Sequence, residues 1–408
     1  MKTILMFPYA NHLGGTQPLV AIAQALRAGG DRVVFAARGK CVGYVRDAGF
    51  DVVDVVELDP AHGVAHINRS SLDYHTPASV AEFVAQETAL IERHAADAVV
   101  DLHRPTLGVS ARLTRTPRAV LCNTVLTRYF AGEKVLPESH PLGALGRFLP
   151  RALLRPASAW VEEQLFRRWA RPYAAYLRAR GAAPVASMKD LFEGDATILM
   201  DAEEFAPTVA LPAHVHRVGP LLHERAEAAP AWLEAIPPER RTIFVYLGSY
   251  GESFTRVVEF LGRALADAAD CHVVAATAGL YAHAGAPCPP NVSVVDYVPA
   301  SAVLARNCAA MITHGGRGSI YSALGHGVPL IGLPNQGEQE WNLDAVERLG
   351  VGRKLSTKRL RFADFLGALR AVLDDPRYRR RAAEFRATLR GYDGARAAAG
   401  VVAALARR

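Results

Sequence analysis

One stretch, residues 311–342, constrains the fold of this chain more than any other. It reads MITHGGRGSIYSALGHGVPLIGLPNQGEQEWN: an apolar run, a glycine turn, a helical segment, a Gly-Val-Pro corner, a second apolar run and a polar loop. Strand, turn, helix and strand in this order are typical of a parallel α/β sheet that binds a nucleotide. Because the first backbone N–H groups of a helix lack partners within it, the glycine turn predicts an anion site.

The residues around this turn suit a diphosphate. We expect backbone amides, the Ser319 hydroxyl and the His314 ring to hold it. The amides are those of Gly316, Arg317, Gly318 and Ser319. The next apolar run leads to Glu338 and Gln339, which can accept from and donate to neighbouring hydroxyls, as sugar recognition requires.

Six short motifs in this half of the chain fall in one order. They are Tyr297-x-Pro299, Thr313-His314-Gly315-Gly316, Gly318-Ser319, Gly327-Val328-Pro329, Glu338-Gln339 and Asn342. Together they resemble the donor-binding signature of family 1 glycosyltransferases, nucleotide-sugar-dependent enzymes that include plant UDP-glycosyltransferases and bacterial natural-product and macrolide glycosyltransferases. The resemblance implies an α/β, GT-B fold, with two Rossmann-like doubly wound domains facing a cleft. It covers nearly the whole chain, strongly after residue 240 and weakly before it.

Length predicts two domains, since 408 residues exceed the usual size of a single core. A strand at 3–7, a helix at 18–28 and a strand at 31–36 predict the start of the first sheet. We place an acceptor-binding domain at 1–219, a linker at 220–230 and a nucleotide-sugar-binding domain at 231–390. The resemblance implies that the closing helix, 391–408, packs back on the first domain.

Composition excludes several classes of protein. The net charge of +7 suits an anionic ligand, but no basic run is interleaved with aromatic residues, so nucleic-acid binding is not expected. The five cysteines are scattered, and no stretch is long enough to span a bilayer, which favours the cytoplasm. His62, His66 and His75 lack a third acid or thiol ligand at a recognised spacing, so we expect no metal.

The loop after the first strand departs from the family pattern. Family members carry a Gly-His pair there, and that histidine deprotonates the acceptor hydroxyl. Counting back from Pro18 places Gly15 at this position, or Gly14 if the register slips by one. The nearest histidine is His12, which is either the base, brought in by a longer loop, or a solvated loop residue.

Asp101 ends the strand predicted at 98–101, where family members have an aspartate that orients the catalytic histidine. It either pairs with His12 or acts as the base itself. The alternative is an ordinary salt bridge at the strand end, with His103 and Arg104.

Polar loop residues and a long helical segment are expected around the acceptor. The polar or small candidates are Asn11, Gly14, Gly15, His62, His66 and Asn123, with the two histidines on a loop predicted at 59–75. Residues 131–181 are helical in pattern and rich in aromatics and arginines, so an apolar or aromatic acceptor would fit them. Docking of this segment on a membrane surface is the less favoured alternative.

The domain placed at 231–390 matches the family pattern at some positions and departs from it at others. The resemblance implies that Gly248 and Ser249 approach the diphosphate, that Tyr297 stacks on the nucleobase and that the backbone of Val298 reads the base edge. Ser322 stands where many UDP-sugar enzymes have a ribose-binding glutamate, which makes a dTDP-sugar plausible. Glu338 and Gln339 instead favour a hydroxyl-rich hexose such as glucose.

The sequence therefore predicts an inverting enzyme that moves a hexose from a UDP- or dTDP-sugar to a hydroxyl of a small, apolar or aromatic natural product. Neither cofactor nor metal is expected, and the protein is expected to be a monomer or a homodimer. One rival is a silent homologue that binds a nucleotide or a partner enzyme, suggested by the missing histidine, Ala300 and Ser322. The other is a GT-B epimerase, whose catalytic carboxylates find no match here.

Overall fold

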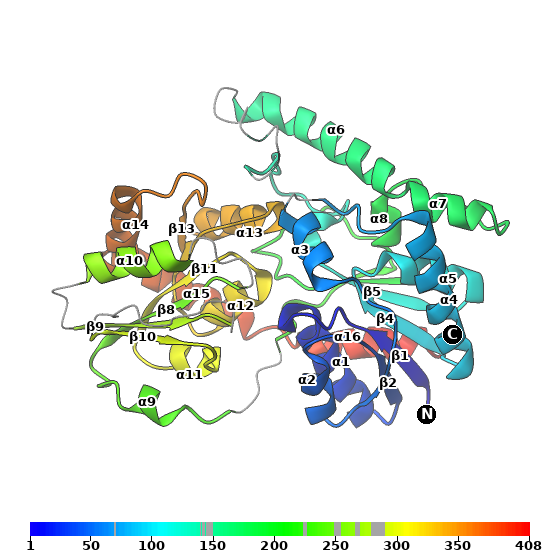
Figure 1. Ribbon diagram of the computed structural model, residues 1–408, viewed down its shortest axis with the longest axis horizontal. Helices are drawn as coiled ribbons and strands as arrows, with labels where there is room; N and C mark the ends of the chain where they lie inside the picture. The colour runs from blue at the N-terminus through cyan, green and yellow to red at the C-terminus, as the bar shows by residue number, and fades with distance from the viewer. Residues whose placement is uncertain are drawn as a thin grey trace. The chain divides into compact units, whose positions relative to one another are not determined.

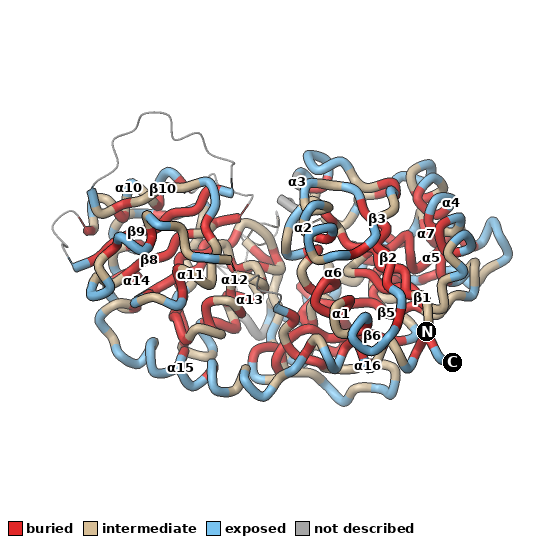
Figure 2. Tube along the Cα trace, turned by 90° about the horizontal axis from the view of Figure 1, so that it is seen from below, coloured by how far each residue is buried: buried red, intermediate tan, exposed pale blue. Residues whose placement is uncertain are grey.

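A computed structural model describes residues 1–68, 71–138, 140, 143, 150–222, 227–248, 254–265, 270–278 and 290–408 (Figure 1). The chain forms two compact units. The first comprises Met1–His223 and Tyr392–Arg408, and the second Glu224–Gly391. Each contains one parallel sheet covered by helices, and the strands of both sheets are largely buried (Figure 2).

The sheet of the first unit has the strand order β3-β2-β1-β4-β5-β6-β7, and neighbouring strands run parallel. The strands are β1 (Thr3–Phe7), β2 (Arg32–Ala36), β3 (Asp51–Val53), β4 (Ala98–Leu102), β5 (Arg118–Cys122), β6 (Ala196–Leu199) and β7 (Val215–Arg217). The helices are α1 (Gln17–Ala28), α2 (Val42–Asp47), α3 (Pro60–Asn68), α4 (Pro77–Arg93), α5 (Pro105–Thr114), α6 (Arg151–Trp169), α7 (Arg171–Arg178), α8 (Met188–Leu191) and α16 (Gly394–Leu405).

The strand order reverses between β1 and β4. Phe7, the last residue of β1, lies opposite Asp101 in β4. Ligands of such sheets bind beyond the carboxyl ends of the strands at this reversal. The loop after β1 and the end of β4, which carry His12 and Asp101, therefore share the ligand-binding edge of the first sheet.

Helix α16 belongs to the core of the first unit. Its Val402 and Leu405 are buried in one apolar cluster with Ile4 of β1 and Ile22 of α1. Where the chain returns to this unit, Gly394 packs tightly against Pro220. A Cβ added to Gly394 would lie 2.5 Å from the Pro220 carbonyl oxygen.

The sheet of the second unit has the order β10-β9-β8-β11-β12-β13, also parallel. Its strands are β8 (Arg241–Tyr246), β9 (Cys271–Ala276), β10 (Val292–Val295), β11 (Cys308–Thr313), β12 (Leu330–Gly332) and β13 (Gly352–Lys354). Its helices are α9 (Ala231–Glu234), α10 (Phe254–Ala264), α11 (Ala300–Leu304), α12 (Arg317–Gly325), α13 (Gly337–Arg348), α14 (Phe362–Asp374) and α15 (Pro376–Leu389). The order reverses between β8 and β11, where Tyr246 lies opposite Thr313.

The predicted α/β class with two doubly wound sheets is confirmed, but two predictions for single elements are wrong. Residues 60–68 form helix α3 instead of a loop, and the polar loop predicted before Asn342 is the first part of helix α13, which begins at Gly337. Helix α3 begins after Asp59, whose carboxylate accepts a hydrogen bond from the His62 N–H at 2.9 Å. Aspartate followed by proline is thus a helix start here.

Among the described residues, every helix is too short or too polar to span a lipid bilayer. Likewise, among these residues no three histidine, cysteine, aspartate or glutamate side chains are grouped so as to hold a metal ion.

Candidate active site

The glycine turn between β11 and α12 has a shape that requires glycine. Gly315 has a φ of +88°, and a Cβ there would lie 2.7 Å from two carbon atoms of Leu343. Gly316 then precedes α12 with extended backbone and provides no side-chain cap. The first amides of α12, those of Arg317, Gly318 and Ser319, therefore form a positively polarised helix start suited to an anion.

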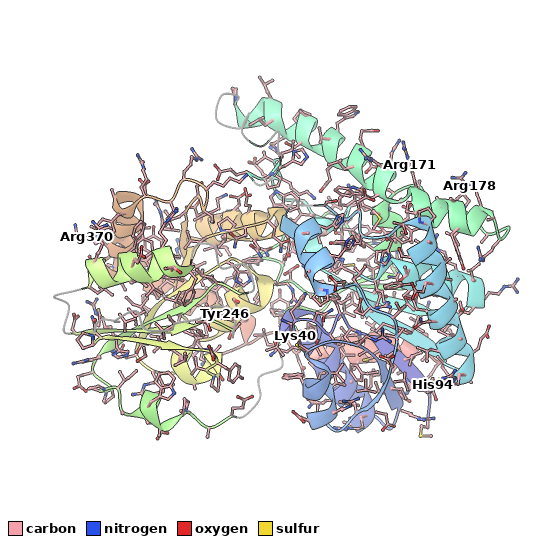
Figure 3. All side chains as sticks on the ribbon, in the orientation of Figure 1. Lys40, His94, Arg171, Arg178, Tyr246 and Arg370 are labelled. Carbon is pink, nitrogen blue, oxygen red and sulfur yellow. The ribbon has the colours of Figure 1, made fainter. Side chains whose placement is uncertain are left out.

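The His314 ring fills the space between two glycines. A Cβ on Gly316 would lie 2.4 Å from its Nε2 atom, and one on Gly248 would lie 3.0 Å from its Cε1 atom. The ring also meets the edge of Tyr246, labelled in Figure 3, at 6.0 Å between centroids. The structure thus brings Gly248, His314 and the α12 start together at the reversal of the second sheet, while Ser249 lies outside the described residues.

Helix α13 fixes this turn. Asn342 donates hydrogen bonds from Nδ2 to the Gly315 carbonyl oxygen at 3.2 Å and to Glu338 Oε1 at 3.0 Å. Gln339 is buried, and its Oε1 accepts from the Asn335 N–H at 2.9 Å. The two side chains predicted to read sugar hydroxyls thus lie on the first turn of α13, directly linked to the glycine turn.

Of the three residues predicted to recognise the nucleoside, Tyr297 and Val298 lie on the loop between β10 and α11, and Ser322 lies on α12. Tyr297 is 60% exposed and donates from its hydroxyl to Glu227 at 2.9 Å. Val298 is buried. Ser322 lies half-buried on α12, and its carbonyl oxygen is 2.9 Å from Nδ1 of His326.

In the first unit, His12 caps the short helical turn Leu13–Gly15. Its Nδ1 accepts the Gly15 N–H at 2.9 Å, and its ring packs edge-on against Tyr9 at 5.1 Å. A neutral imidazole that accepts at Nδ1 carries its proton on Nε2. In this conformation His12 is therefore a hydrogen-bond donor toward a ligand, and not a proton acceptor.

The His12 ring resists protonation. Desolvation by the surrounding protein lowers the pKa of the imidazole below its ordinary value of 6.5. The side chain is nevertheless exposed, so solvent weakens this effect relative to a buried histidine. Protonation at Nδ1 would also break the hydrogen bond from the Gly15 N–H, and this loss lowers the pKa of the ring as well.

Gly15, to which counting back from Pro18 assigns the family histidine, leaves no room for a side chain. A Cβ there would lie 2.5 Å from the Tyr9 carbonyl oxygen and 3.1 Å from Cε1 of His12. A Cβ on Gly14 would meet its nearest neighbour, Nδ1 of His12, at 3.5 Å, which is an ordinary contact. Position 15 therefore has no space for a side chain while the His12 ring caps the helical turn.

Asp101 is fully buried and bound on both carboxylate oxygens. Arg118 donates from Nε to Oδ1 at 2.7 Å and from Nη2 to Oδ2 at 2.9 Å, and the backbone N–H of Arg104 donates to Oδ2 at 2.8 Å. The ion pair expected with His103 or Arg104 is thus made with Arg118 instead. Sequence reasoning missed Arg118 because only the register of β5 against β4 brings it to Asp101.

A second buried ionic group lies beside Asp101. The Arg104 guanidinium donates to Glu87 at 2.7 Å, to Glu57 at 2.8 Å and to the Val56 carbonyl oxygen at 2.7 Å. Burial raises the pKa of the Glu57 carboxyl, although Arg104 opposes that shift. Because buried charges are stable only when paired, this group ties the segment after β3 to the end of β4.

The predicted acceptor residues lie on the segments that follow β1, β3 and β5. Nδ2 of Asn11 donates to the Leu58 carbonyl oxygen at 3.5 Å. On α3 the rings of His62 and His66 are 4.5 Å apart, and Nε2 of His62 lies 3.2 Å from the Tyr74 carbonyl oxygen. Asn123 follows β5, where its backbone N–H donates to Nε2 of His103 at 3.2 Å.

Comparison with known proteins places this geometry in context. The family profile described as "Erythromycin biosynthesis protein CIII-like, C-terminal domain" matches residues 263–392. The "PGL/p-HBAD biosynthesis glycosyltransferase" of Mycobacterium tuberculosis is 31% identical over 326 residues, which cover 78% of this chain and 72% of the relative. The "PGL/p-HBAD biosynthesis rhamnosyltransferase" of Mycobacterium bovis is 30% identical over 312 residues, or 76% of this chain and 67% of the relative.

Solved structures agree on the fold. The crystal structure of the glycotransferase of kitacinnamycin aligns with a TM-score of 0.74 at 22% identity, covering 99% of this chain and 98% of the other. The calicheamicin glycosyltransferase CalG4 aligns with a TM-score of 0.70 at 22% identity, covering 100% and 99%. The two α/β units, each with one parallel sheet, thus match the domains of the GT-B fold.

Replacement of Gly15 tests the account of the first loop. Gly15→Ala should lower the free energy of unfolding by about 1–3 kcal/mol, because its methyl group would overlap the Tyr9 carbonyl oxygen. Gly14→Ala is the matched control and should change it by less than about 0.5 kcal/mol. Urea unfolding of both variants measures the difference; equal stabilities would contradict the described loop.

Proposed function

Because the chain belongs to the family 1 glycosyltransferases, we propose that it moves a hexose from a UDP- or dTDP-sugar to a hydroxyl of a small, apolar or aromatic natural product. The observation that carries this proposal is the start of α12, where uncapped amides lie beside the His314 ring and are linked through Asn342 to Glu338. The mycobacterial relative named a rhamnosyltransferase supports including 6-deoxyhexoses among the sugars.

The reaction we propose is one in-line displacement that inverts the anomeric carbon. The bond from that carbon to the diphosphate oxygen breaks as the bond to the acceptor oxygen forms, and the diphosphate keeps the bonding electrons. Its growing charge is stabilised by the α12 amides, by the helix dipole and by His314. Glu338 and Gln339 orient the sugar hydroxyls, and no cofactor takes part.

The acceptor proton needs a base, and we propose His12 for this role. The ring must first release the Gly15 N–H and carry its proton on Nδ1, so that Nε2 can accept from the acceptor hydroxyl. A lowered pKa keeps it unprotonated at neutral pH. Asp101, bound by Arg118, then serves as a positioning residue for the end of β4.

Transfer should be observable directly. Incubation with UDP-glucose or dTDP-rhamnose and a panel of phenols should give a glycoside of inverted anomeric configuration, read from the anomeric proton coupling by NMR. His314→Ala should lower kcat/KM about 100-fold, as expected when one donor to a developing anion is removed.

His326→Ala provides the matched control, since His326 lies at the other end of α12 and contacts Ser322. It should leave kcat/KM within about twofold of wild type. A product of retained configuration would contradict the displacement mechanism, and unchanged kinetics of His314→Ala would remove that ring from the diphosphate site.

One observation favours a second candidate function, a silent homologue that binds a nucleotide without turnover. Both candidate bases are engaged: Nδ1 of His12 by the Gly15 N–H, and Asp101 by Arg118 and the Arg104 N–H. A protein that keeps these bonds would hold the donor and transfer nothing.

His12→Asn separates the two functions. Asparagine can cap the Gly15 N–H but cannot take a proton, so stability should be kept while kcat falls by about 10²-fold or more, with nucleotide affinity unchanged. Because the base must be neutral, the wild-type kcat should be level at neutral pH and fall as pH drops through the lowered pKa of His12. A wild-type kcat in His12→Asn would show that His12 is only a cap; a wild-type protein that binds nucleotide but never turns over is the silent homologue.

A further inference from the structure

Helices α6 and α7 share an exposed stripe on the outside of the first unit. Ala170 continues the helical pattern from α6 into α7, because its N–H donates to the Phe166 carbonyl oxygen and its own carbonyl oxygen accepts from the Ala174 N–H. Exposed residues that recur three, four or seven positions apart therefore lie on one side of both helices. These residues, which we call the α6–α7 stripe, are Leu153, Trp160, Gln164, Arg168, Arg171, Ala175 and Arg178. Arg171 and Arg178 are labelled in Figure 3, on the side of α7 away from α4.

The apolar members of the stripe do not belong to the core. Trp160 is 65% exposed and Leu153 is 61% exposed. Three other aromatic residues of these helices, Phe166, Trp169 and Tyr173, are buried in one apolar cluster on the opposite side. Packing within the unit therefore accounts for these three aromatic residues, but not for Trp160 or Leu153.

The carboxylates of α6 and α7 lie outside the stripe. The two helices contain only Glu162 and Glu163, and both are half-buried. Glu162 pairs with Lys134 and, at 3.5 Å, with Lys189. Glu163 pairs with Arg167 at 3.0 Å. The acidic side chains are thus neutralised beside the stripe, and the charged residues of the stripe itself are all cations.

The arginines of the stripe keep their charge available to a partner. Arg168, Arg171 and Arg178 are exposed. Within the part of the chain that the structure describes, their guanidinium groups form neither an ion pair nor a hydrogen bond. Exposed arginines aligned on one side of a helix, with no carboxylate among them, create a positive potential that attracts anions.

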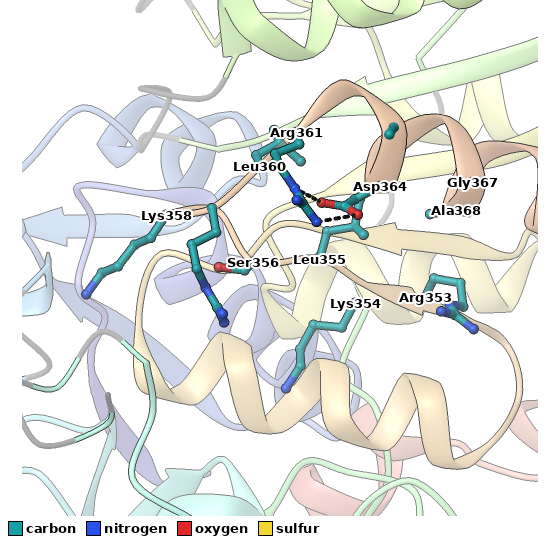
Figure 4. A pocket seen from close by; sticks show the side chains of 12 residues that line it. Arg353, Lys354, Leu355, Ser356, Lys358, Leu360, Arg361, Asp364, Gly367 and Ala368 are labelled. Atoms are coloured by element: carbon teal, nitrogen blue, oxygen red, sulfur yellow. Dashed lines mark hydrogen bonds and ion pairs between the residues drawn. The ribbon is translucent and has the colours of Figure 1, made fainter. Parts of the chain in front are cut away.

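The cations beside the hollow between β13 and α14 show the opposite arrangement (Figure 4). Arg361 donates from Nε and Nη2 to the two carboxylate oxygens of Asp364 at 2.7 and 3.1 Å. Lys354 pairs with Asp344. Positive charge at this hollow is therefore matched by carboxylates of the same unit, as it is not in the α6–α7 stripe.

The shape and chemistry of the stripe fit the surface of a membrane. At about 1.5 Å per residue, the stripe from Leu153 to Arg178 is roughly 35 Å long, which suits a broad surface and not a single small anion. A tryptophan side chain with an apolar body and one N–H favours the boundary between lipid headgroups and acyl chains. Arginines beside it lie at the level of the headgroups and are attracted to anionic lipids.

From this arrangement we infer that the α6–α7 stripe docks the protein on a membrane surface that contains anionic lipids. Trp160 and Leu153 insert among the headgroups, and the three arginines contact lipid phosphates. Membrane docking was the less favoured alternative for residues 131–181 in the sequence, and the exposure of Trp160 and the separation of the charges now favour it. The inference does not rest on the proposed transfer reaction, because vesicle binding is measured without donor or acceptor.

Co-sedimentation of the full chain with lipid vesicles tests the inference. The protein should bind vesicles of phosphatidylglycerol and phosphatidylcholine much more tightly than vesicles of phosphatidylcholine alone. The triple variant Arg168→Ala/Arg171→Ala/Arg178→Ala should lower the partition coefficient on anionic vesicles about fivefold for each guanidinium, or on the order of 100-fold in all.

The matched control removes the same charge from another surface. Arg370→Ala/Arg380→Ala/Arg390→Ala changes three exposed arginines of the second unit. It should change the partition coefficient by less than about threefold, because charges more than about 8 Å from the lipid are screened at physiological ionic strength.

Insertion of Trp160 has its own signal. Lipids brominated on their acyl chains should quench the tryptophan fluorescence of the wild-type protein on anionic vesicles. Trp160→Phe should keep most of the binding, because phenylalanine is also apolar, but should remove most of the quenching.

Three results would overturn the inference. One is equal binding to the two kinds of vesicle, or binding to neither, because the arginines would then have no anionic lipid to contact. Another is an equal loss of binding in the two triple variants, which would reflect net charge alone. The third is quenching that survives in Trp160→Phe, because a different surface would then face the lipid.

Discussion

The packing of α13 against the glycine turn determines the shape of the donor site. Leu343 is fully buried and lies so close to Gly315 and Gly332 that a Cβ on either would approach it within 2.7 Å or less. Asn342 closes the same contact with a hydrogen bond to the Gly315 carbonyl oxygen. This contact places α13, to which we assign the sugar, beside the start of α12, to which we assign the diphosphate. In this proposal each half of the donor site is positioned by the other.

The first unit is held at its ligand-binding edge by buried charges instead. Asp101 with Arg118, and Arg104 with Glu57 and Glu87, connect β3, β4, α4 and β5. Ionic groups buried in this way contribute little net stability, but removal of one partner leaves an uncompensated charge at a cost of about 3–5 kcal/mol. The network therefore holds the end of β4 and the segments beside it in one arrangement.

Local patterns in the sequence were enough to predict the α/β class, most strands and the donor turn. The apolar runs of β1, β8 and β11 have the length and β-branched composition of buried strands, and glycines 315 and 316 mark a turn that side chains would block. Contacts between residues far apart in the chain, and the state of single side chains, could not be predicted from these local patterns. The partner of Asp101 depends on strand register, and the tautomer of His12 depends on one hydrogen bond from Gly15. Helix α3 was missed because the helix start at Asp59-Pro60 was not recognised, although that signal is present in the sequence.

We propose that the start of α12, His314 and the turn at Gly248 bind the diphosphate of a nucleotide sugar. Calorimetric titration of the protein with UDP, dTDP, GDP and ADP, side by side and without added metal, tests this proposal. We expect saturable binding of UDP or dTDP at one site per chain. Equal affinity for UDP and dTDP would fit Ser322 in place of a ribose-binding carboxylate, because a serine discriminates weakly between ribose and deoxyribose. If none of the four nucleotides binds, these residues do not form a diphosphate site.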